Sequence, residues 1–301
     1  MLREQLGFDG IVCTDWGLIC DAEIFGEPMP ARAWGVEHLS PLERAAKVLD
    51  AGADQFGGEF CTELVIELVH SGRIGEARLD RSARRLLTEK FRLGLFDDRR
   101  HVDPDQADEV VGSSRFRVLG ETAQRRSLTL LKNDSELLPL GGDRPKLYVR
   151  NVAADVAGRY GDVVDDPAEA DFAVLRLSTP FDARPGGFES FFHAGRLDFP
   201  AEELDEILAL LHAVPTVVAI HLERPAVIPE IADSAAALLG VYGASDTALF
   251  YVLFGHATPQ GRLPFQLPRS VTEVEQSLPD QPQQSADPLF PLGFGLQYPA
   301  A

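Results

Sequence analysis

The chain has 301 residues, 45% hydrophobic and 25% charged, the composition of an ordinary globular protein with room for two modest domains, each with its own core. The formal net charge of −19 at pH 7 disfavours nucleic acids and anionic membranes as partners, because both carry charge of the same sign. No apolar run reaches the roughly 20 residues that a membrane helix needs.

The cysteines and the first residues of the chain indicate the cellular compartment in which the protein is expected. Cys13, Cys20 and Cys61 are odd in number and show no CxxC spacing, so they indicate neither a disulfide framework nor a zinc site. Residues 1–6 are an amphipathic helical start that contains an acid and lacks the apolar core of a secretory signal. We therefore expect a reducing compartment and a cytoplasmic location.

The first predicted strand places a carboxylate at the edge of a sheet. Residues 11–13 are a continuous apolar run, typical of a short strand buried on both faces, and Asp15 follows on a tight turn. Parallel α/β enzymes keep their chemistry at such strand ends, which makes Asp15 a candidate catalytic group. The alternative is a turn former or a helix N-cap. Trp16 favours catalysis, because aromatic rings pack against the C–H faces of sugars.

An irregular excursion comes next, followed by helices and a strand. The excursion holds Trp34 and His38 and is expected to be an active-site loop. Ser40, Pro41 and Glu43 are typical of a capped helix start, and that helix is expected to end near residue 52. A strand at 53–56 and helices at about 59–71 and 77–93 follow. Alternating strands and helices predict a parallel sheet.

The pattern changes in the second part of the chain. Residues 98–125 are expected to be a charged linker and a helix, and residues 126–268 an open α/β sandwich with a mainly parallel sheet. The tail, 269–301, is expected to pack back on the domains. The predicted strands are Lys146–Arg150, Phe172–Ser178, Thr216–His221 and Ala236–Val241, and the predicted helices lie near 115–126, 201–213 and 245–254.

Five segments, in one order along the chain, carry a family pattern. They are LGFDGIVCTDWG at 6–17, KFRLGLFD at 90–97, SLTLLKNDSELLPL at 127–140, VLFGHATPQGRLP at 252–264 and PLGFGLQY at 291–298. Together they resemble glycoside hydrolase family 3, which includes β-glucosidases, β-xylosidases and exo-glucanases. The first segment is similar to the family's nucleophile segment, GFxGxVxSDW.

The resemblance implies a fold for each part. Residues 1–97 would be the C-terminal part of a (β/α)8 TIM-like barrel from the nucleophile strand onward, and residues 126–268 the family's α/β sandwich. Only about two of eight strand-helix units are present, so the chain looks like a family member without its N-terminal half. That half supplies most sugar-binding residues in the family. An incomplete barrel exposes a strand edge, which predicts self-association.

The resemblance also implies a reaction. A retaining glycosidase needs a nucleophilic carboxylate and a second carboxyl group about 5–5.5 Å away that acts as acid and base. The resemblance assigns the nucleophile to Asp15. Glu189 is the candidate acid/base, on a loop where phenylalanines would raise its pKa. The alternative is that Glu189 is a solvated loop acid, and then His193 and Asp182 are the other candidate acids.

Further residues are candidates for contact with the sugar. The candidate substrate-binding residues are Trp16, Arg32, Trp34, His38 and His193. Trp34 would stack on the sugar or pack beneath its own loop. Asp54 and Gln55 would contact the sugar or act as caps. His221, Glu223 and Arg224 match no family motif and are predicted to be structural.

The sequence thus predicts a β-glucosidase-like hydrolase that acts on terminal non-reducing β-D-glycosidic bonds with retention and without a cofactor or metal. The expected partner is a small-molecule or oligosaccharide β-glycoside, with no nucleic acid and no membrane. The alternative function is that of a catalytically inactive family 3 fragment that acts as a binding or interaction module.

Overall fold

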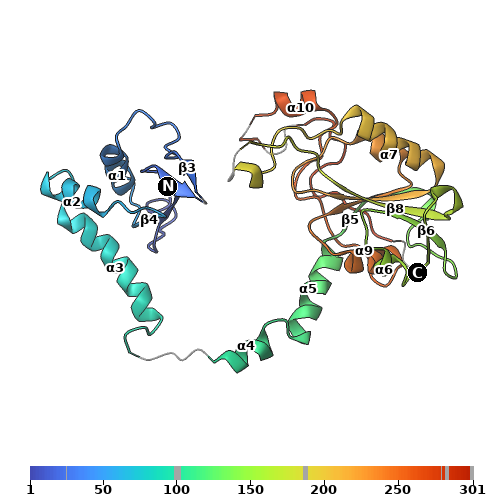
Figure 1. Ribbon diagram of the computed structural model, residues 1–301, viewed down its shortest axis with the longest axis horizontal. Coiled ribbons are helices and arrows are strands. Elements are labelled where there is room, and N and C mark those ends of the chain that lie inside the picture. The colour runs from blue at the N-terminus through green and yellow to red at the C-terminus, as the bar shows by residue number, and fades with distance from the viewer. Residues whose placement is uncertain (25, 98–102, 186–188, 279, 282–284, 299–301) are drawn as a thin grey trace. The chain divides into compact units, whose positions relative to one another are not determined.

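The computed structural model describes residues 1–24, 26–97, 103–185, 189–278, 280–281 and 285–298 (Figure 1). The chain divides into two compact units. One comprises Met1–Pro104 with Pro185–Phe191, and the other Asp105–Arg184 with Phe192–Ala301. Within these described ranges, no helix combines the length and the apolar character needed to cross a membrane.

The first unit is a small α/β body around a two-stranded parallel sheet. β1 and β4 form this sheet, and β2 and β3 form an antiparallel hairpin. The elements are β1 (Cys13–Trp16), β2 (Ala22–Ile24), β3 (Glu27–Met29), α1 (Pro41–Asp50), β4 (Gln55–Gly57), α2 (Thr62–His70) and α3 (Glu76–Arg92). The parallel pairing of β1 with β4 through α1 is the arrangement that the alternating pattern predicts.

β1 differs from its prediction. The sequence predicts a strand at residues 11–13 that is buried on both faces, whereas the strand is Cys13–Trp16 and three of its four residues are exposed. Asp15 therefore lies within the strand and not on a turn after it. In the described part of the chain β1 pairs with β4 alone, so its other edge and much of its surface have no covering strand.

α1 begins as predicted. The Ser40 side chain accepts a hydrogen bond from the Glu43 N–H, and the Glu43 carboxylate accepts one from the Ser40 N–H, which makes a capping box in front of Pro41. One face of the helix is buried in the core of the unit. That core contains Ile19, Ala45, Ala46, Leu49, Cys61, Leu68 and Ile74. Ile19 anchors the segment after β1 to this core.

The second unit is built on a six-stranded sheet with the order β5-β10-β9-β8-β6-β7. The last five strands of this order are parallel, and β5 runs antiparallel to β10. The strands are β5 (Thr129–Asn133), β6 (Lys146–Arg150), β7 (Asp162–Val164), β8 (Phe172–Ser178), β9 (Thr216–His221) and β10 (Ala237–Val241). The mainly parallel α/β sheet is thus confirmed.

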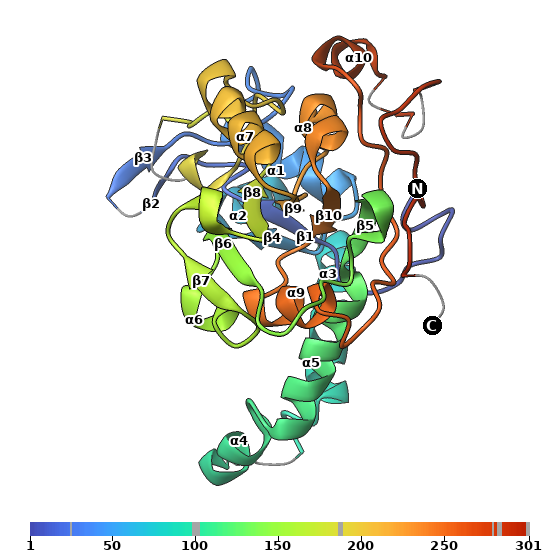
Figure 2. The same cartoon turned by 90° about the vertical axis from the view of Figure 1, so that its right-hand side faces the viewer.

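Helices cover both faces of this sheet. The helices from residue 104 onward are α4 (Pro104–Val110), α5 (Ser114–Ser127), α6 (Ala154–Ala157), α7 (Ala201–Ala213), α8 (Pro229–Ser234), α9 (Asp246–Leu253) and α10 (Val271–Gln276). α7 and α8 lie on one face, and α6 and α9 on the other (Figure 2). In β9, Val218 and Ile220 point into the core with α7 and α8, while Val217 and Ala219 belong to the opposite core. Burial on both faces explains the continuous apolar strands.

The C-terminal segment packs on the second unit. Leu296 forms a backbone bridge with Leu130 of β5, and the Tyr298 hydroxyl donates a 2.7 Å hydrogen bond to the Val252 carbonyl. Burial raises the pKa of this hydroxyl. The segment therefore covers part of the edge of the sheet at β5, which limits the exposure of unpaired backbone there.

Candidate functional site

Asp15 is an open carboxylate in the first unit. Its Oδ1 accepts a 2.8 Å hydrogen bond from the Trp16 N–H, and its Oδ2 lies 3.7 Å from Nη1 of Arg32. The Asp15 side chain is 60% exposed, while that of Arg32 is 14% exposed. The structure thus brings together three of the residues that the sequence singled out, and it leaves the carboxylate accessible.

A β-hairpin, and not the irregular loop that was expected, carries Arg32 to Asp15. After β2 and β3, the Arg32 N–H donates a 2.7 Å hydrogen bond to the Gly17 carbonyl. Gly17 has φ +64, and a Cβ there would lie 2.6 Å from Cε of Met29, which is buried. The hairpin therefore folds back onto the end of β1, and the positive φ of Gly17 favours glycine at this position.

The indole of Trp16 packs on the backbone that follows β4. A Cβ at Gly58 would lie 2.0 Å from Cδ1 of Trp16, and Gly58 has φ +61. The Thr14 hydroxyl accepts a 2.8 Å hydrogen bond from the Gly57 N–H, which fixes β1 beside β4 at this point. Trp16 is nevertheless 57% exposed, so the ring remains available for contact with a ligand.

Two charged residues that the sequence analysis did not single out hold the segment after β1. Glu59 accepts hydrogen bonds from the N–H groups of Ile19, at 2.7 Å, and Cys20, at 3.3 Å. Arg44 donates to the Ile19 carbonyl at 3.1 Å and to the Glu37 carbonyl at 2.8 Å. The partners of Glu59 and Arg44 are distant along the chain. From the sequence, both residues would therefore be expected simply to face solvent.

Trp34 and His38 are exposed residues of the segment that follows the hairpin, and the Trp34 N–H donates a 2.8 Å hydrogen bond to the Arg32 carbonyl. Trp34 is 72% exposed, and His38 is also exposed. Their role in sugar binding stays a prediction.

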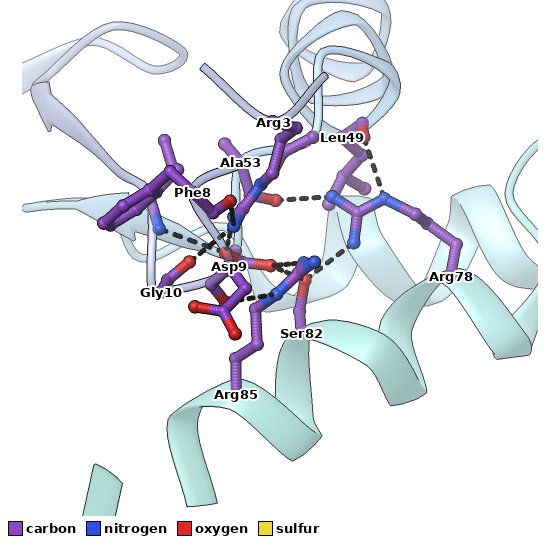
Figure 3. Close-up of polar contacts among 12 residues, drawn as sticks. Arg3, Phe8, Asp9, Gly10, Leu49, Ala53, Arg78, Ser82 and Arg85 are labelled. Carbon is purple, nitrogen blue, oxygen red and sulfur yellow. Dashed lines mark hydrogen bonds and ion pairs between the residues drawn. The ribbon is translucent and has the colours of Figure 1, made fainter. Parts of the chain in front are cut away.

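Asp54 has a structural role. Its side chain is fully buried. Its Oδ1 accepts hydrogen bonds from the Ser82 hydroxyl at 2.7 Å and from Nη1 of Arg85 at 2.9 Å. Its Oδ2 accepts from the Val12 N–H at 3.0 Å and pairs with Arg3. Figure 3 shows Arg3, Ser82 and Arg85 converging on one point. Asp54 therefore ties the start of the chain, β4 and α3 together and does not face a ligand.

Opposing effects set the protonation of Asp54. Burial raises the pKa of this carboxyl, but hydrogen bonds from Ser82, Val12 and Arg85 and the Arg85 charge outweigh burial. The pKa of Asp54 is consequently lower than its ordinary value, and the carboxylate is the form that holds the cluster together.

Glu189 lies at the start of a short 3-10 helix, Glu189–Phe191, in the segment after β8. Its side chain and residues 186–188 lie outside the described residues. Phe191 and Phe192 are 72% and 52% exposed. These two rings are therefore largely exposed to solvent, and they do not form the buried apolar enclosure that was expected around Glu189.

The two ends of the loop that carries Glu189 are joined to each other. The Asp182 N–H donates a 2.8 Å hydrogen bond to the Ala194 carbonyl. The Asp182 carboxylate accepts from the Arg196 N–H at 2.9 Å and from its Nε at 3.2 Å. A Cβ at Gly195 would lie 1.9 Å from Oδ2 of Asp182. Asp182 braces the loop ends, and its role as an alternative acid stays a prediction.

Arg224 adds a second brace to the same loop. Its guanidinium donates to the carbonyl groups of Pro180 at 2.6 Å, Arg196 at 3.1 Å and Gly195 at 3.3 Å. These carbonyl groups lie on both ends of the loop. Arg224 therefore has the structural role that was predicted, and the structure that it stabilises is the loop that carries Glu189.

His193 takes part in this bracing as well. Its Nδ1 lies 2.5 Å from Oε1 of Glu223, and its ring stacks on Phe181 with the centroids 3.7 Å apart and an interplanar angle of 10°. His193 is exposed but engaged on one nitrogen and one face. Its role as a substrate-binding residue stays a prediction. Its partner Glu223 was predicted only as structural, because nothing in the sequence links residues so far apart.

The described residues contain no candidate metal site. Within the described ranges, no group of three or more histidine, cysteine, aspartate and glutamate side chains is placed to hold a metal ion.

Comparisons with known proteins show what the chain is similar to. Residues 157–298 match the glycosyl hydrolase family 3 C-terminal domain. The chain is 50% identical over 301 residues to the probable β-glucosidase C of Aspergillus flavus, covering 99% of this chain and 47% of that protein. It is 39% identical over 313 residues to the periplasmic β-glucosidase/β-xylosidase of Dickeya chrysanthemi, covering 99% and 47%.

The fold agrees with these relationships. The β-glucosidase of Listeria innocua, solved in complex with isofagomine, superposes with a TM-score of 0.78 at 20% identity, over 99% of this chain and 49% of that one. The chain spans about half the length of the curated relatives it matches. The resemblance seen in the five sequence segments is confirmed: residues 157–298 match the C-terminal domain of glycoside hydrolase family 3, and 99% of the chain is similar to β-glucosidases.

Proposed function

We propose that this chain carries the nucleophile and the acid/base of a retaining β-glucosidase-like hydrolase, which removes terminal non-reducing β-D-glycosyl residues. The observation that carries the proposal is the open Asp15 carboxylate on β1, beside Arg32 and Trp16, in the segment similar to the family's nucleophile segment. The names of the relatives, β-glucosidase and β-xylosidase, support a β-glycoside as the substrate.

Asp15 acts as the nucleophile in this proposal. One of its oxygens attacks the anomeric carbon while the bond to the departing oxygen breaks, and the sugar becomes an ester of Asp15. Each carboxylate oxygen has two lone pairs. The Trp16 N–H engages Oδ1, and the Arg32 guanidinium faces Oδ2. Each oxygen therefore keeps a lone pair for the sugar, while its orientation is held.

Glu189 acts as the acid and then as the base. Its proton goes to the departing oxygen in the first step, and it takes a proton from the attacking water in the second. The braces made by Asp182 and Arg224 support this assignment, because a proton donor must be held in a defined position to act.

We also infer that residues 1–97 are the C-terminal part of a (β/α)8 barrel. The parallel β1–α1–β4 unit supports this, since the repeated unit of such a barrel has this connection. In this arrangement Asp15, the last residue but one of β1, lies near the carboxyl end of its strand, on the side where barrel enzymes keep their catalytic groups.

The test compares Asp15→Asn with the parent chain on a chromogenic β-glucoside. We expect the parent to hydrolyse it and Asp15→Asn to be slower by about three orders of magnitude or more. Glu23→Gln, which neutralises an exposed acid of the hairpin, should match the parent. Equal rates of hydrolysis by Asp15→Asn and the parent would show that Asp15 is not the nucleophile.

The second candidate function is that of an interaction module. The exposed surface of β1 supports it, because a strand edge without a neighbour pairs readily with another chain. A pure, folded parent chain without hydrolytic activity, and with a molecular mass in solution above that of the monomer, would favour this candidate over the enzyme.

A further inference from the structure

The short segment between β1 and the hairpin is held from two directions. Glu59, just after β4, uses both carboxylate oxygens on it: Oε1 accepts from the Ile19 N–H at 2.7 Å, and Oε2 accepts from the Cys20 N–H at 3.3 Å. Arg44 of α1 donates to the Ile19 carbonyl at 3.1 Å. An anion therefore holds the N–H of Ile19 and a cation holds its carbonyl, while its side chain is fully buried.

The charges on Glu59 and Arg44 make these contacts strong. Hydrogen bonds to a charged group are roughly twice as strong as those between neutral groups. Both side chains are half-buried, so water competes with them less than it would at the surface. A carboxylate also offers two acceptor oxygens, which is what two adjacent N–H groups require.

The same segment fixes the returning arm of the hairpin. Gly17, two residues before Ile19, accepts a 2.7 Å hydrogen bond from the Arg32 N–H. Asp21, two residues after Ile19, accepts a 2.8 Å hydrogen bond from the Ala31 N–H on its Oδ1. The backbone of Ala31 and Arg32 is therefore attached to the segment on both sides of Ile19.

Different elements position the two members of the Arg32–Asp15 pair. Asp15 lies in β1, which the Thr14 hydroxyl ties to β4. Arg32 is placed by the segment 17–21. The 3.7 Å separation between Nη1 of Arg32 and Oδ2 of Asp15 consequently depends on where this segment lies. A displacement of about 1 Å near a reacting group can lower a rate by about 100-fold.

We propose that Glu59 is a positioning residue, which acts together with Arg44 to hold Arg32 against the Asp15 carboxylate. The inference rests on the proposed function for the role of Asp15 as the nucleophile, and it adds to that function a residue that follows β4. Both oxygens of Glu59 accept from the main chain, so its carboxylate acts on the segment and not on the substrate.

Amide hydrogen exchange of the full chain tests this arrangement without a substrate. Glu59→Gln keeps the shape of the side chain but replaces one acceptor oxygen with an NH2 group, which cannot accept from an N–H. We expect the Ile19 and Arg32 N–H groups to exchange about tenfold faster or more than in the parent, and the amides inside α3 to change less. Glu67→Gln, the same change at an exposed position of α2, should match the parent at the Ile19 and Arg32 amides.

Hydrolysis of a chromogenic β-glucoside, measured at a temperature where every variant is folded, tests the route through Arg32. In the parent background Glu59→Gln should lower kcat about tenfold and change KM by less than about twofold, because the contact orients the nucleophile. In the Arg32→Ala background the same substitution should lower kcat by less than about twofold, because the guanidinium that Glu59 positions is already absent. A purely structural role would give the same loss in both backgrounds.

The outcomes separate this proposal from the proposed function. Unchanged exchange at the Arg32 N–H in Glu59→Gln, or an equal increase at the α3 amides, overturns the positioning role. An equal loss of kcat in the two backgrounds overturns it as well. Faster exchange at the Arg32 N–H, in a chain whose parent form shows no hydrolysis, supports the hold of Glu59 on Arg32 and counts against the proposed function.

Discussion

The guanidinium of Arg32 lies 3.7 Å from the carboxylate of Asp15, and the arginine is the buried member of the pair, with 14% of its side chain exposed against 60% for Asp15. The attraction between this half-enclosed cation and the open carboxylate offsets part of the cost of removing the guanidinium from water, and it also restricts the position of the carboxylate. The pair therefore links the β2–β3 hairpin to the proposed chemistry at β1.

Arg32→Ala should reduce hydrolysis of a β-glucoside more than it reduces stability. Loss of a charged partner of this kind costs about 1.5–3 kcal/mol, so kcat/KM should fall about 10- to 100-fold. Arg32→Lys should recover part of the loss. Arg73→Ala, which breaks the exposed pair with Asp50, is the control and should leave kcat/KM unchanged. An Arg32→Ala chain with the kcat/KM of the parent would show that the pair has no catalytic role.

Gly58→Ala should displace the indole of Trp16. The added Cβ would lie 2.0 Å from the ring, and φ +61 adds backbone strain, so the ring must move. The chain has two tryptophans, so fluorescence in a Trp34→Phe background reports Trp16 alone, and its emission maximum should shift. Gly72→Ala has a similar φ, +71, and open space around the Cβ, so it controls for strain without the clash. An unchanged Trp16 emission in Gly58→Ala would contradict this packing.

Asp54→Asn should destabilise the first unit. Removing the charge leaves Arg3 and Arg85 without their buried partner, which costs about 3–5 kcal/mol in the free energy of unfolding near pH 7. Both tryptophans belong to the first unit, so urea unfolding followed by fluorescence measures it. Asp50→Asn, in an exposed pair, should cost less than about 1 kcal/mol. Equal losses for the two variants would refute the structural role of Asp54.

The Asp54 carboxyl group should also make the stability of the first unit depend on pH in the acid range. The pKa of Asp54 is lower in the folded chain than its ordinary value, which is about 3.9 when unfolded. Its contribution is therefore fully present above that unfolded pKa and is lost as the pH falls through it toward the lower folded pKa. Between about pH 5 and pH 2, the free energy of unfolding should fall more for the parent than for Asp54→Asn. Parallel curves of this free energy against pH for the two chains would exclude the contribution.

Arg224→Ala should loosen the loop that carries Glu189. The Asp182 and Arg196 N–H groups, hydrogen-bonded at the base of the loop, should exchange with solvent deuterium about tenfold faster or more. If Glu189 is the acid, hydrolysis of glucosides with poor leaving groups should fall more than hydrolysis of those with good ones, because only the former need a proton. Arg159→Ala, in an exposed pair on the same unit, is the control. Unchanged exchange at both amides would show that Arg224 does not hold the loop.

Local signals were sufficient where an element is buried on both faces or has a capped end. The bounds of β6, β8 and β9 agree with the prediction, and so does the start of α1 at its capping box. β7 has only three residues, of which two are exposed at the edge of the sheet, and such a strand has no apolar pattern to detect. β5 was not predicted as a strand, since it runs antiparallel at the other edge and is defined by its pairing with β10.

The sequence alone determined the resemblance to glycoside hydrolase family 3, the alternation of strands and helices in the second unit, and the choice of Asp15 as the candidate nucleophile, because motifs and apolar periodicity are local properties of the chain. Only the tertiary structure decided that Asp54 is buried in an arginine cluster, that Arg32 faces Asp15, and that Asp182 and Arg224 brace a loop. These roles arise from contacts between residues far apart along the chain. An aspartate or arginine code letter does not reveal which distant partner will neutralise its charge or accept its hydrogen bonds.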